Sequence, residues 1–263
     1  MIVELFGPPG GGKTTFASAL TAFLRERGQA VDPLMSYRPA EQAYAPACTA
    51  HTRHQPAAPL QRLGRPLVEM LATAGHLLSH SKDFRATAEL MRLLPTRDLM
   101  WAIRLRQYLW RLFRIWDTAV RSSDVVVFDQ AFVQAVGSLA LLARAPEGAC
   151  IGRALDAIPR ADLLIQIDAP RDALAARLTR RQQHQGRVER LLELDLQTNL
   201  AFGETIGDLQ ARLRARGRPV LRLECADQPT LRAGVETAGA AVLARRPAQS
   251  ALGPQAARRP EHA

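Results

Sequence analysis

The chain contains 263 residues, 47% of them hydrophobic, and its 35 basic and 25 acidic residues give a formal net charge of +10. This length and hydrophobic content support a real core and favour one large domain with an insertion over two small domains. No uninterrupted apolar run is long enough to cross a bilayer, so we expect no membrane span.

The positive charge comes almost entirely from arginine, since only two of the 35 basic residues, Lys13 and Lys82, are lysines. An excess of this kind is compatible with binding to nucleic acid or anionic lipid. The arginines are spread along the chain without a recognisable nucleic-acid-binding signature, which argues against a nucleic acid partner. Cys48, Cys150 and Cys225 lack Cys-x-x-Cys spacing and are expected to be reduced, structural thiols.

Residues 7–14 read Gly-Pro-Pro-Gly-Gly-Gly-Lys-Thr, which is the spacing of a phosphate-binding loop. The apolar run Ile2–Phe6 before them predicts a buried strand, and residues 16–24 after them predict a helix. A strand, a glycine-rich loop and a helix in this order form the context that confirms such a loop. Because the pattern begins at residue 7, we expect no cleaved secretion signal before it and a cytoplasmic protein.

The residue types of this loop suit a polyphosphate. Glycines let the backbone curl so that successive N–H groups point inward, and the following helix adds the positive end of its dipole. Lys13 supplies a mobile charge for the β- and γ-phosphates, and the Thr14 hydroxyl is suited to Mg²⁺. The residues expected to hold the nucleotide phosphates are Gly7, Pro8, Pro9, Gly10, Gly11, Gly12, Lys13, Thr14 and Thr15.

Four further apolar runs predict strands, at residues 30–35, 125–128, 163–167 and 220–223, and helical stretches separate them. This alternation predicts an α/β fold of the P-loop NTPase type, with a parallel five-stranded sheet, helices on both faces and a helical insertion. The core is expected to comprise residues 1–36 and 122–244. Residues 245–263, rich in alanine, proline and arginine, are expected to be a disordered tail.

The predicted insertion covers residues 37–121, which contain no convincing strand. A loop rich in proline and histidine spans residues 39–66, and a helical pattern begins at about residue 67. The pattern includes an apolar helical stripe, interpreted either as core packing or as a stacking surface for an aromatic, phosphorylated acceptor. The stripe consists of Trp101, Leu105, Tyr108, Leu112 and Ile115, with Arg104 and Arg111 at its edge.

Asp129 directly follows the predicted strand at residues 125–128. In a parallel sheet the carboxyl end of this strand lies beside the phosphate loop, so Asp129 can reach a metal ion through water or accept a proton from an attacking oxygen. A helix N-cap is the alternative role. Gln130 stands where motor ATPases place a water-activating acid, which disfavours a hydrolytic motor, and no Asn-Lys-x-Asp motif for guanine is present.

A lid is predicted at about residues 177–190. Pro170 fits the first turn of a helix, on which Arg177 and Arg181 share a face because they are four residues apart. Residues 182–186 are predicted to break this helix before Arg187. Arginines on a helix with a flexible tip can close over a triphosphate, exclude water and neutralise charge on the transferred group.

Together these segments resemble the thymidylate kinase-like branch of P-loop nucleotide kinases. The match covers the phosphate loop, residues 125–129, and residues 162 to about 243. Residues 161–170 are similar to the family's Pro-Asp-Leu…Leu-Asp-x-Pro strand and turn. Residues 177–181 and the Gly-Arg-Val-Glu of residues 186–189 are similar to its lid, and a helix at 191–207 and a strand at 219–223 follow in the family order.

The resemblance implies ATP and Mg²⁺ as cofactors and transfer of the γ-phosphate to a small acceptor, foremost a nucleoside monophosphate. Thr14 and Asp129 would hold Mg²⁺, Arg187 would contact the nucleotide and Arg38 the acceptor. The residues expected to act on the transferred phosphate are Lys13, Asp129, Arg177 and Arg181.

The sequence departs from the family pattern on the acceptor side. Asp129-Gln130-Ala131 stands where the family carries Asp-Arg-Tyr/His, whose arginine helps to hold the acceptor phosphate, and Tyr37-Arg38-Pro39 matches Arg-Glu-Pro in part. The alternatives are therefore a kinase for a sugar or antibiotic hydroxyl and a non-catalytic ATP-binding regulator. A nucleic-acid-associated ATPase would need a catalytic glutamate that the sequence lacks. A homodimer is left open.

Overall fold

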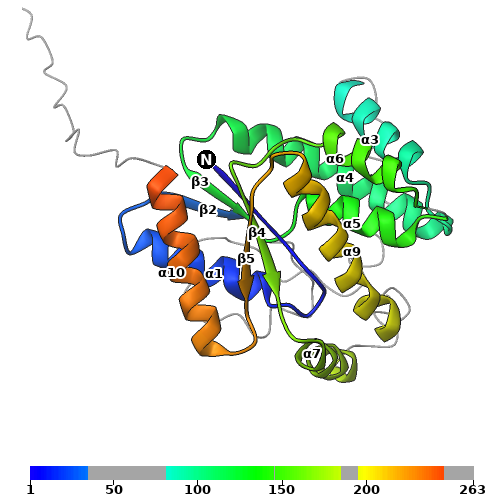
Figure 1. The fold of residues 1–263 in the computed structure, drawn as a ribbon. Coiled ribbons are helices and arrows are strands. Elements are labelled where there is room, and N and C mark those ends of the chain that lie inside the picture. The colour runs from blue at the N-terminus through cyan, green and yellow to red at the C-terminus, as the bar shows by residue number, and fades with distance from the viewer. Residues whose placement is uncertain (35–80, 145, 185–194, 246–263) are drawn as a thin grey trace, which may run out of the picture.

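The structure is a computed structural model that describes residues 1–34, 81–144, 146–184 and 195–245. A sheet of five parallel strands lies at its centre, in the order β2-β3-β1-β4-β5 (Figure 1). The predicted α/β class with a parallel five-stranded sheet is therefore confirmed. The strands are β1 (Ile2–Phe6), β2 (Val31–Leu34), β3 (Val125–Phe128), β4 (Leu163–Asp168) and β5 (Val220–Glu224).

The central strand, β1, is buried on both faces, which explains why its sequence reads as a nearly continuous apolar run. Val3 pairs in register with Val127 of β3 on one side and Leu163 of β4 on the other. The amide of Ile2 donates a 2.6 Å hydrogen bond to the Asp162 carboxylate. The acid just before β4 thus helps to set the register of the two strands.

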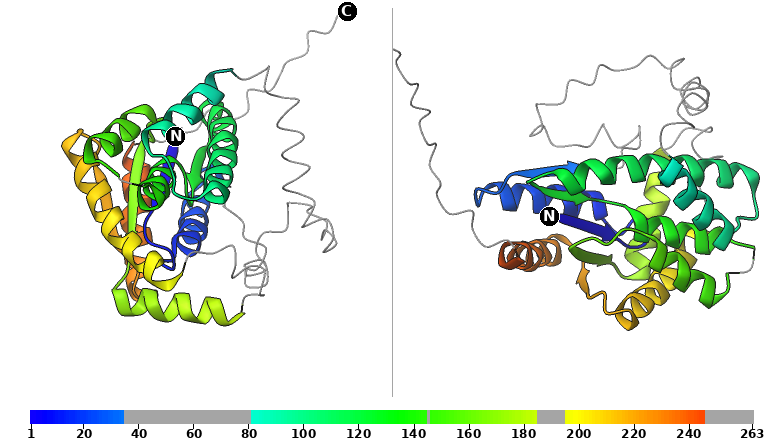
Figure 2. Two further views of the ribbon diagram at one scale, coloured as in Figure 1. Left: turned by 90° about the vertical axis from the view of Figure 1, so that its right-hand side faces the viewer. Right: turned by 90° about the horizontal axis from the view of Figure 1, so that it is seen from above.

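Helices cover both faces of the sheet, as predicted (Figures 1 and 2). One face is covered by α1 (Lys13–Arg25) and α10 (Gln228–Arg245), which share a core cluster with Val3 and Leu5. The other face forms a second cluster with Ile2 and Phe6. Its helices are α3 (Ser81–Leu93), α4 (Leu99–Arg121), α5 (Phe132–Leu142), α6 (Gly148–Ala157) and α9 (Leu196–Ala215).

The apolar stripe of α4 packs into this second cluster. Leu105 and Leu112 are buried, which confirms the core-packing interpretation for these two residues. Leu109 and Trp116 lie at the centre of the contact, while Tyr108 and Ile115 pack at its edge. Trp116 stacks on Phe128 of β3 with ring centroids 5.2 Å apart. The buried stripe, which includes Leu109 and Trp116, therefore lies slightly to one side of the predicted one.

The described part of the predicted insertion, α3 and α4, therefore shares its core with the sheet. Residues 37–80 and 246–263 lie outside the described residues, so the insertion and the disordered tail stay predictions. Within the described ranges, the helices are too short or too polar to span a bilayer.

Three helix boundaries differ from those predicted. The first helix begins at Lys13 and not at residue 16, because the phosphate loop leads directly into its first turn. The helix α7 (Arg171–His184) continues beyond the break predicted at residue 182. The helix α9 ends at Ala215 and not at residue 207, and its last turns bond to α6, where the Arg212 guanidinium donates to the Gly148 carbonyl over 2.9 Å.

Trp116→Ala is expected to lower the free energy of unfolding by about 3–5 kcal/mol, because the side chain is 4% exposed and packs on Phe128 and Phe132. Urea unfolding followed by circular dichroism measures this change. Trp110→Ala on the same helix is the control, since Trp110 is only half-buried beside Arg114 and its loss should be below about 1 kcal/mol. Equal losses for the two variants would contradict the packing of α4.

Candidate phosphate-binding site

The phosphate loop leaves the carboxyl end of β1 and enters α1, between the ends of β3 and β4. Gly7 passes so close to β4 that a Cβ atom there would lie 2.1 Å from the Ile167 carbonyl oxygen. Gly10 and Gly12 have φ angles of 78° and 93°, in the region that favours glycine. The loop therefore needs glycine for two reasons, close approach at its start and left-handed backbone further along.

Lys13 reaches back across this loop. Its Nζ donates to the carbonyl oxygen of Gly7 over 2.8 Å and to that of Pro8 over 3.0 Å. The side chain is 7% exposed, so the ammonium is held at the loop by backbone carbonyls. This contact places a positive charge beside the backbone that the sequence predicts to hold phosphate.

Thr14 and Asp129 meet at the same edge of the sheet. The Thr14 hydroxyl donates to Asp129 Oδ2 over 2.9 Å, and Asp129 is fully buried at the end of β3. The predicted metal-site pair is thus in contact, and a hydroxyl with a carboxylate is a donor set that suits Mg²⁺. Across the described ranges no three His, Cys, Asp or Glu side chains gather as metal ligands, so a cation at this pair would need phosphate oxygens and water as further ligands.

Arg177 of α7 also reaches the phosphate loop. One guanidinium nitrogen donates to the Gly10 carbonyl over 3.2 Å, and the other donates to the carbonyls of Cys225 and Ala226 over 2.9 and 2.6 Å. The side chain therefore links α7, the loop and the turn after β5. Arg181 lies one turn further along α7 and is half-buried.

Two other arginines were predicted to belong to the site, Arg38 for the acceptor and Arg187 for the nucleotide. Both lie outside the described residues. Among the cysteines, Cys225 is buried, and burial raises the pKa of its thiol to about 11. A neutral, buried thiol fits the structural role predicted for it. Cys150 is half-buried, and Cys48 lies outside the described residues.

Two buried polar residues behind the loop were not among the predicted site residues. Gln134 Oε1 accepts a 3.0 Å hydrogen bond from the Gly7 amide, and Glu4 Oε1 accepts a 2.6 Å bond from the Val133 amide. Gln134 is 6% exposed and Glu4 is fully buried. A signal for both exists in the sequence, since each is a single polar residue inside an otherwise apolar strand or helix start.

Glu4 is an acid in an apolar setting. Burial raises the pKa of its carboxyl to about 7, although the Val133 amide and the Arg218 charge oppose the shift. The hydroxyl of Tyr108 is enclosed nearby, and burial together with the charges of Asp129 and Glu4 raises the pKa of this phenol above its usual range. The side of the sheet that carries Asp129 is therefore a region of low polarity in which charges interact strongly.

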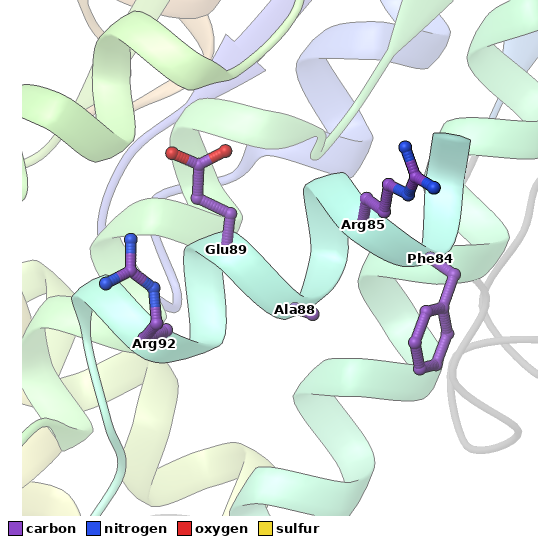
Figure 3. Close-up of a pocket in the computed structure, with 5 residues that line it drawn as sticks. All are labelled: Phe84, Arg85, Ala88, Glu89 and Arg92. Carbon is purple, nitrogen blue, oxygen red and sulfur yellow. The ribbon is translucent and has the colours of Figure 1, made fainter. Parts of the chain in front are cut away.

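A shallow hollow of about 460 Å³ lies on the surface of α3 (Figure 3). All of its lining residues come from this single helix, and a site with convergent polar groups normally draws on several elements. We therefore place the candidate site at the phosphate loop. The residues that line the hollow are Phe84, Arg85, Ala88, Glu89 and Arg92.

No protein-family model and no curated protein matches the chain. An activity is therefore inferred from the contacts of Lys13, Thr14 and Asp129 and from the sequence motifs.

Glu4→Gln is expected to remove a loss of stability that occurs as the pH rises. The pKa of the Glu4 carboxyl is about 7 in the folded protein and 4.5 ordinarily. The protonated carboxyl therefore makes its full contribution to stability below pH 4.5, and stability is lost as the pH rises towards 7. Between pH 5 and pH 8, native protein should lose roughly 2 kcal/mol relative to the variant.

Urea unfolding at the two pH values measures this difference. Glu236→Gln is the control, because Glu236 is exposed on α10 and its replacement should leave the pH dependence as it is in the native protein. A Glu4→Gln variant with the native pH dependence would show that Glu4 does not titrate between these values.

Proposed function

We propose that the protein is an ATP-dependent phosphotransferase that moves the γ-phosphate of ATP to a small acceptor. The observation that supports this best is the meeting of Lys13, Thr14 and Asp129 at the carboxyl edge of β1 and β3. Open parallel sheets bind ligands at this edge, and the three side chains carry the charge, hydroxyl and acid that phosphoryl transfer requires.

Each group has a role in the proposal. The loop amides and the start of α1 cradle the phosphates, and Lys13 neutralises charge that develops on the transferred group. Mg²⁺, held by Thr14 and Asp129 together with phosphate oxygens, supplies further neutralisation and orients the phosphates. Because the transition state of this reaction is loose and highly charged, positioning and electrostatics provide most of the acceleration.

Arg177 is proposed to stabilise the loop and the closed lid together. Its contacts with Gly10 and with the turn after β5 already position the guanidinium beside the loop. Arg181 and Arg187 are proposed to complete the lid around the triphosphate. This role follows from the resemblance and from the position of α7 beyond the carboxyl ends of the strands (Figure 1).

The acceptor proposed first is a nucleoside monophosphate, as in the thymidylate kinase-like family, with Arg38 near its phosphate. A second candidate is a hydroxyl of a sugar or antibiotic. Gln130 favours this second acceptor, because a neutral amide next to Asp129 supplies no fixed positive charge for an acceptor phosphate.

Lys13→Ala is expected to lower turnover by about 10²-fold or more without unfolding the protein, because alanine suits the start of α1 while the charge is lost. Initial rates of ADP and product formation measure the effect. Lys82→Ala removes the second lysine of the chain, which is exposed on α3, and should leave the affinity for MgATP unchanged. Near-normal turnover of Lys13→Ala would exclude the proposed role.

The acceptor can be identified by incubating the protein with ATP, Mg²⁺ and a panel of nucleoside monophosphates, nucleosides, sugars and aminoglycosides. Formation of a phosphorylated product in the same amount as ADP would support the kinase activity and identify its substrate class. MgATP binding without product from any acceptor would instead favour a non-catalytic ATP-binding regulator. Absence of any Mg²⁺-dependent nucleotide binding would contradict the proposed function.

A further inference from the structure

We propose that Gln134 is a positioning residue that fixes the Lys13 ammonium through the backbone of Gly7, with Glu4 holding Gln134 in place. The proposal deepens the proposed function, because it concerns the residue that would meet the nucleotide phosphates. Gln134 and Glu4 are not expected to touch the nucleotide themselves.

The Gly7 residue is held from three directions. Its N–H donates to Gln134 Oε1 over 3.0 Å, and its carbonyl accepts from Lys13 Nζ over 2.8 Å. Its Cα lies so close to the Ile167 carbonyl that no Cβ can be accommodated. The orientation of the Gly7 backbone therefore determines where its carbonyl points, and this carbonyl is one of two that position Nζ.

Gln134 is well suited to impose that orientation. It lies in the first turn of α5, and its side chain is 6% exposed. The neighbouring Phe132 packs between the rings of Phe113 and Trp116, with centroid distances of 4.6 and 5.2 Å. The helix start is thus fixed in the core, and the amide of Gln134 has little freedom to move.

Glu4 fixes the same helix start from the central strand. The residue at the N-cap of α5, Ala131, has no side chain that can bond to the first amides of the helix. Glu4 Oε1 accepts from the Val133 amide over 2.6 Å instead, so a strand residue replaces the missing cap. A carboxylate at this position also interacts favourably with the positive end of the helix dipole.

These contacts form one continuous path from Glu4 of β1, through the start of α5 and Gln134, to Gly7 and Lys13. All of these side chains are buried, so solvent cannot replace a lost hydrogen bond easily. Loss of the Gln134 amide frees the Gly7 N–H, which belongs to the peptide group before the Gly7 Cα. The Gly7 backbone can then turn about this Cα, and its carbonyl, in the following peptide group, moves the Lys13 ammonium away from the phosphates.

The first test measures hydrogen exchange at the Gly7 amide in the full chain without nucleotide. Gln134→Met removes the acceptor at similar volume and should reduce the protection of this amide about tenfold. Gln134→Glu retains an acceptor oxygen and should keep the protection. Gln210→Met replaces a glutamine of α9 that is similarly buried, at 8% exposure, and should leave Gly7 protected. Unchanged protection in Gln134→Met, with the fold retained, would overturn the proposal.

The second test is a double-mutant cycle on MgATP binding, measured by calorimetry. Gln134→Met should weaken binding about fivefold in the native background and less than about twofold in the Lys13→Ala background, because Gln134 acts through Lys13. Equal weakening in both backgrounds would overturn the positioning role. If the native protein does not bind MgATP, the proposed function fails, whereas the exchange experiment still decides whether Gln134 fixes the Gly7 peptide.

Discussion

The close approach of Gly7 to β4 is the constraint on which the candidate site depends. Because Gly7 has no Cβ atom, the backbone can pass directly against the Ile167 carbonyl between the end of β1 and the start of α1. The central position of β1 then places this exit beside the end of β3, where Asp129 is buried. The sheet order and the close approach at Gly7 thus bring the start of α1 to the end of β3, where Thr14 contacts Asp129.

The polar groups behind the loop show how this position is maintained. An apolar core would pack equally well against β1, yet Glu4 and Gln134 are placed there with strong hydrogen bonds to backbone amides. Such bonds contribute only about 1 kcal/mol each in net stability, and a buried acid opposes folding once it ionises. What these hydrogen bonds contribute is orientation, because a hydrogen bond fixes the direction of a backbone N–H group and apolar packing does not. Such control suits the proposed function, in which the loop presents the Lys13 charge at a defined point.

Much of the fold was predictable from the sequence because its signals are local. The apolar runs of β1 and β3 and the spacing of the phosphate loop predicted the strands, the class and the position of Lys13. The roles of Gln134 and Glu4 depend on contacts 127 and 129 residues apart, which no local pattern reveals. The orientation of α4 was predicted only in part, since Trp116 is placed by aromatic contacts with β3 that periodicity does not encode.

Some of the many arginines have a structural role in the part of the chain that the structure describes. A guanidinium offers five donors in a planar arrangement, which suits carbonyl groups at helix ends and turns, whereas an ammonium acts as a compact point charge. The Arg177 guanidinium donates hydrogen bonds to three backbone carbonyls. The Arg218 guanidinium, on a side chain that is 7% exposed, donates to the Leu155 carbonyl. Several others also bond to backbone carbonyls, namely Arg25, Arg27, Arg97, Arg212, Arg216 and Arg245.

This use of arginine gives Lys13 its significance. In a chain whose basic residues are almost all arginines, the phosphate loop has a lysine whose carbonyl contacts lie within the loop itself. A guanidinium presents its donors in a planar fork, whereas the Gly7 and Pro8 carbonyls both accept from one nitrogen, which suits a compact ammonium. The shape of the ammonium is therefore a reason for lysine at position 13, in a loop whose start is held by Gln134 and passes close to the end of β4.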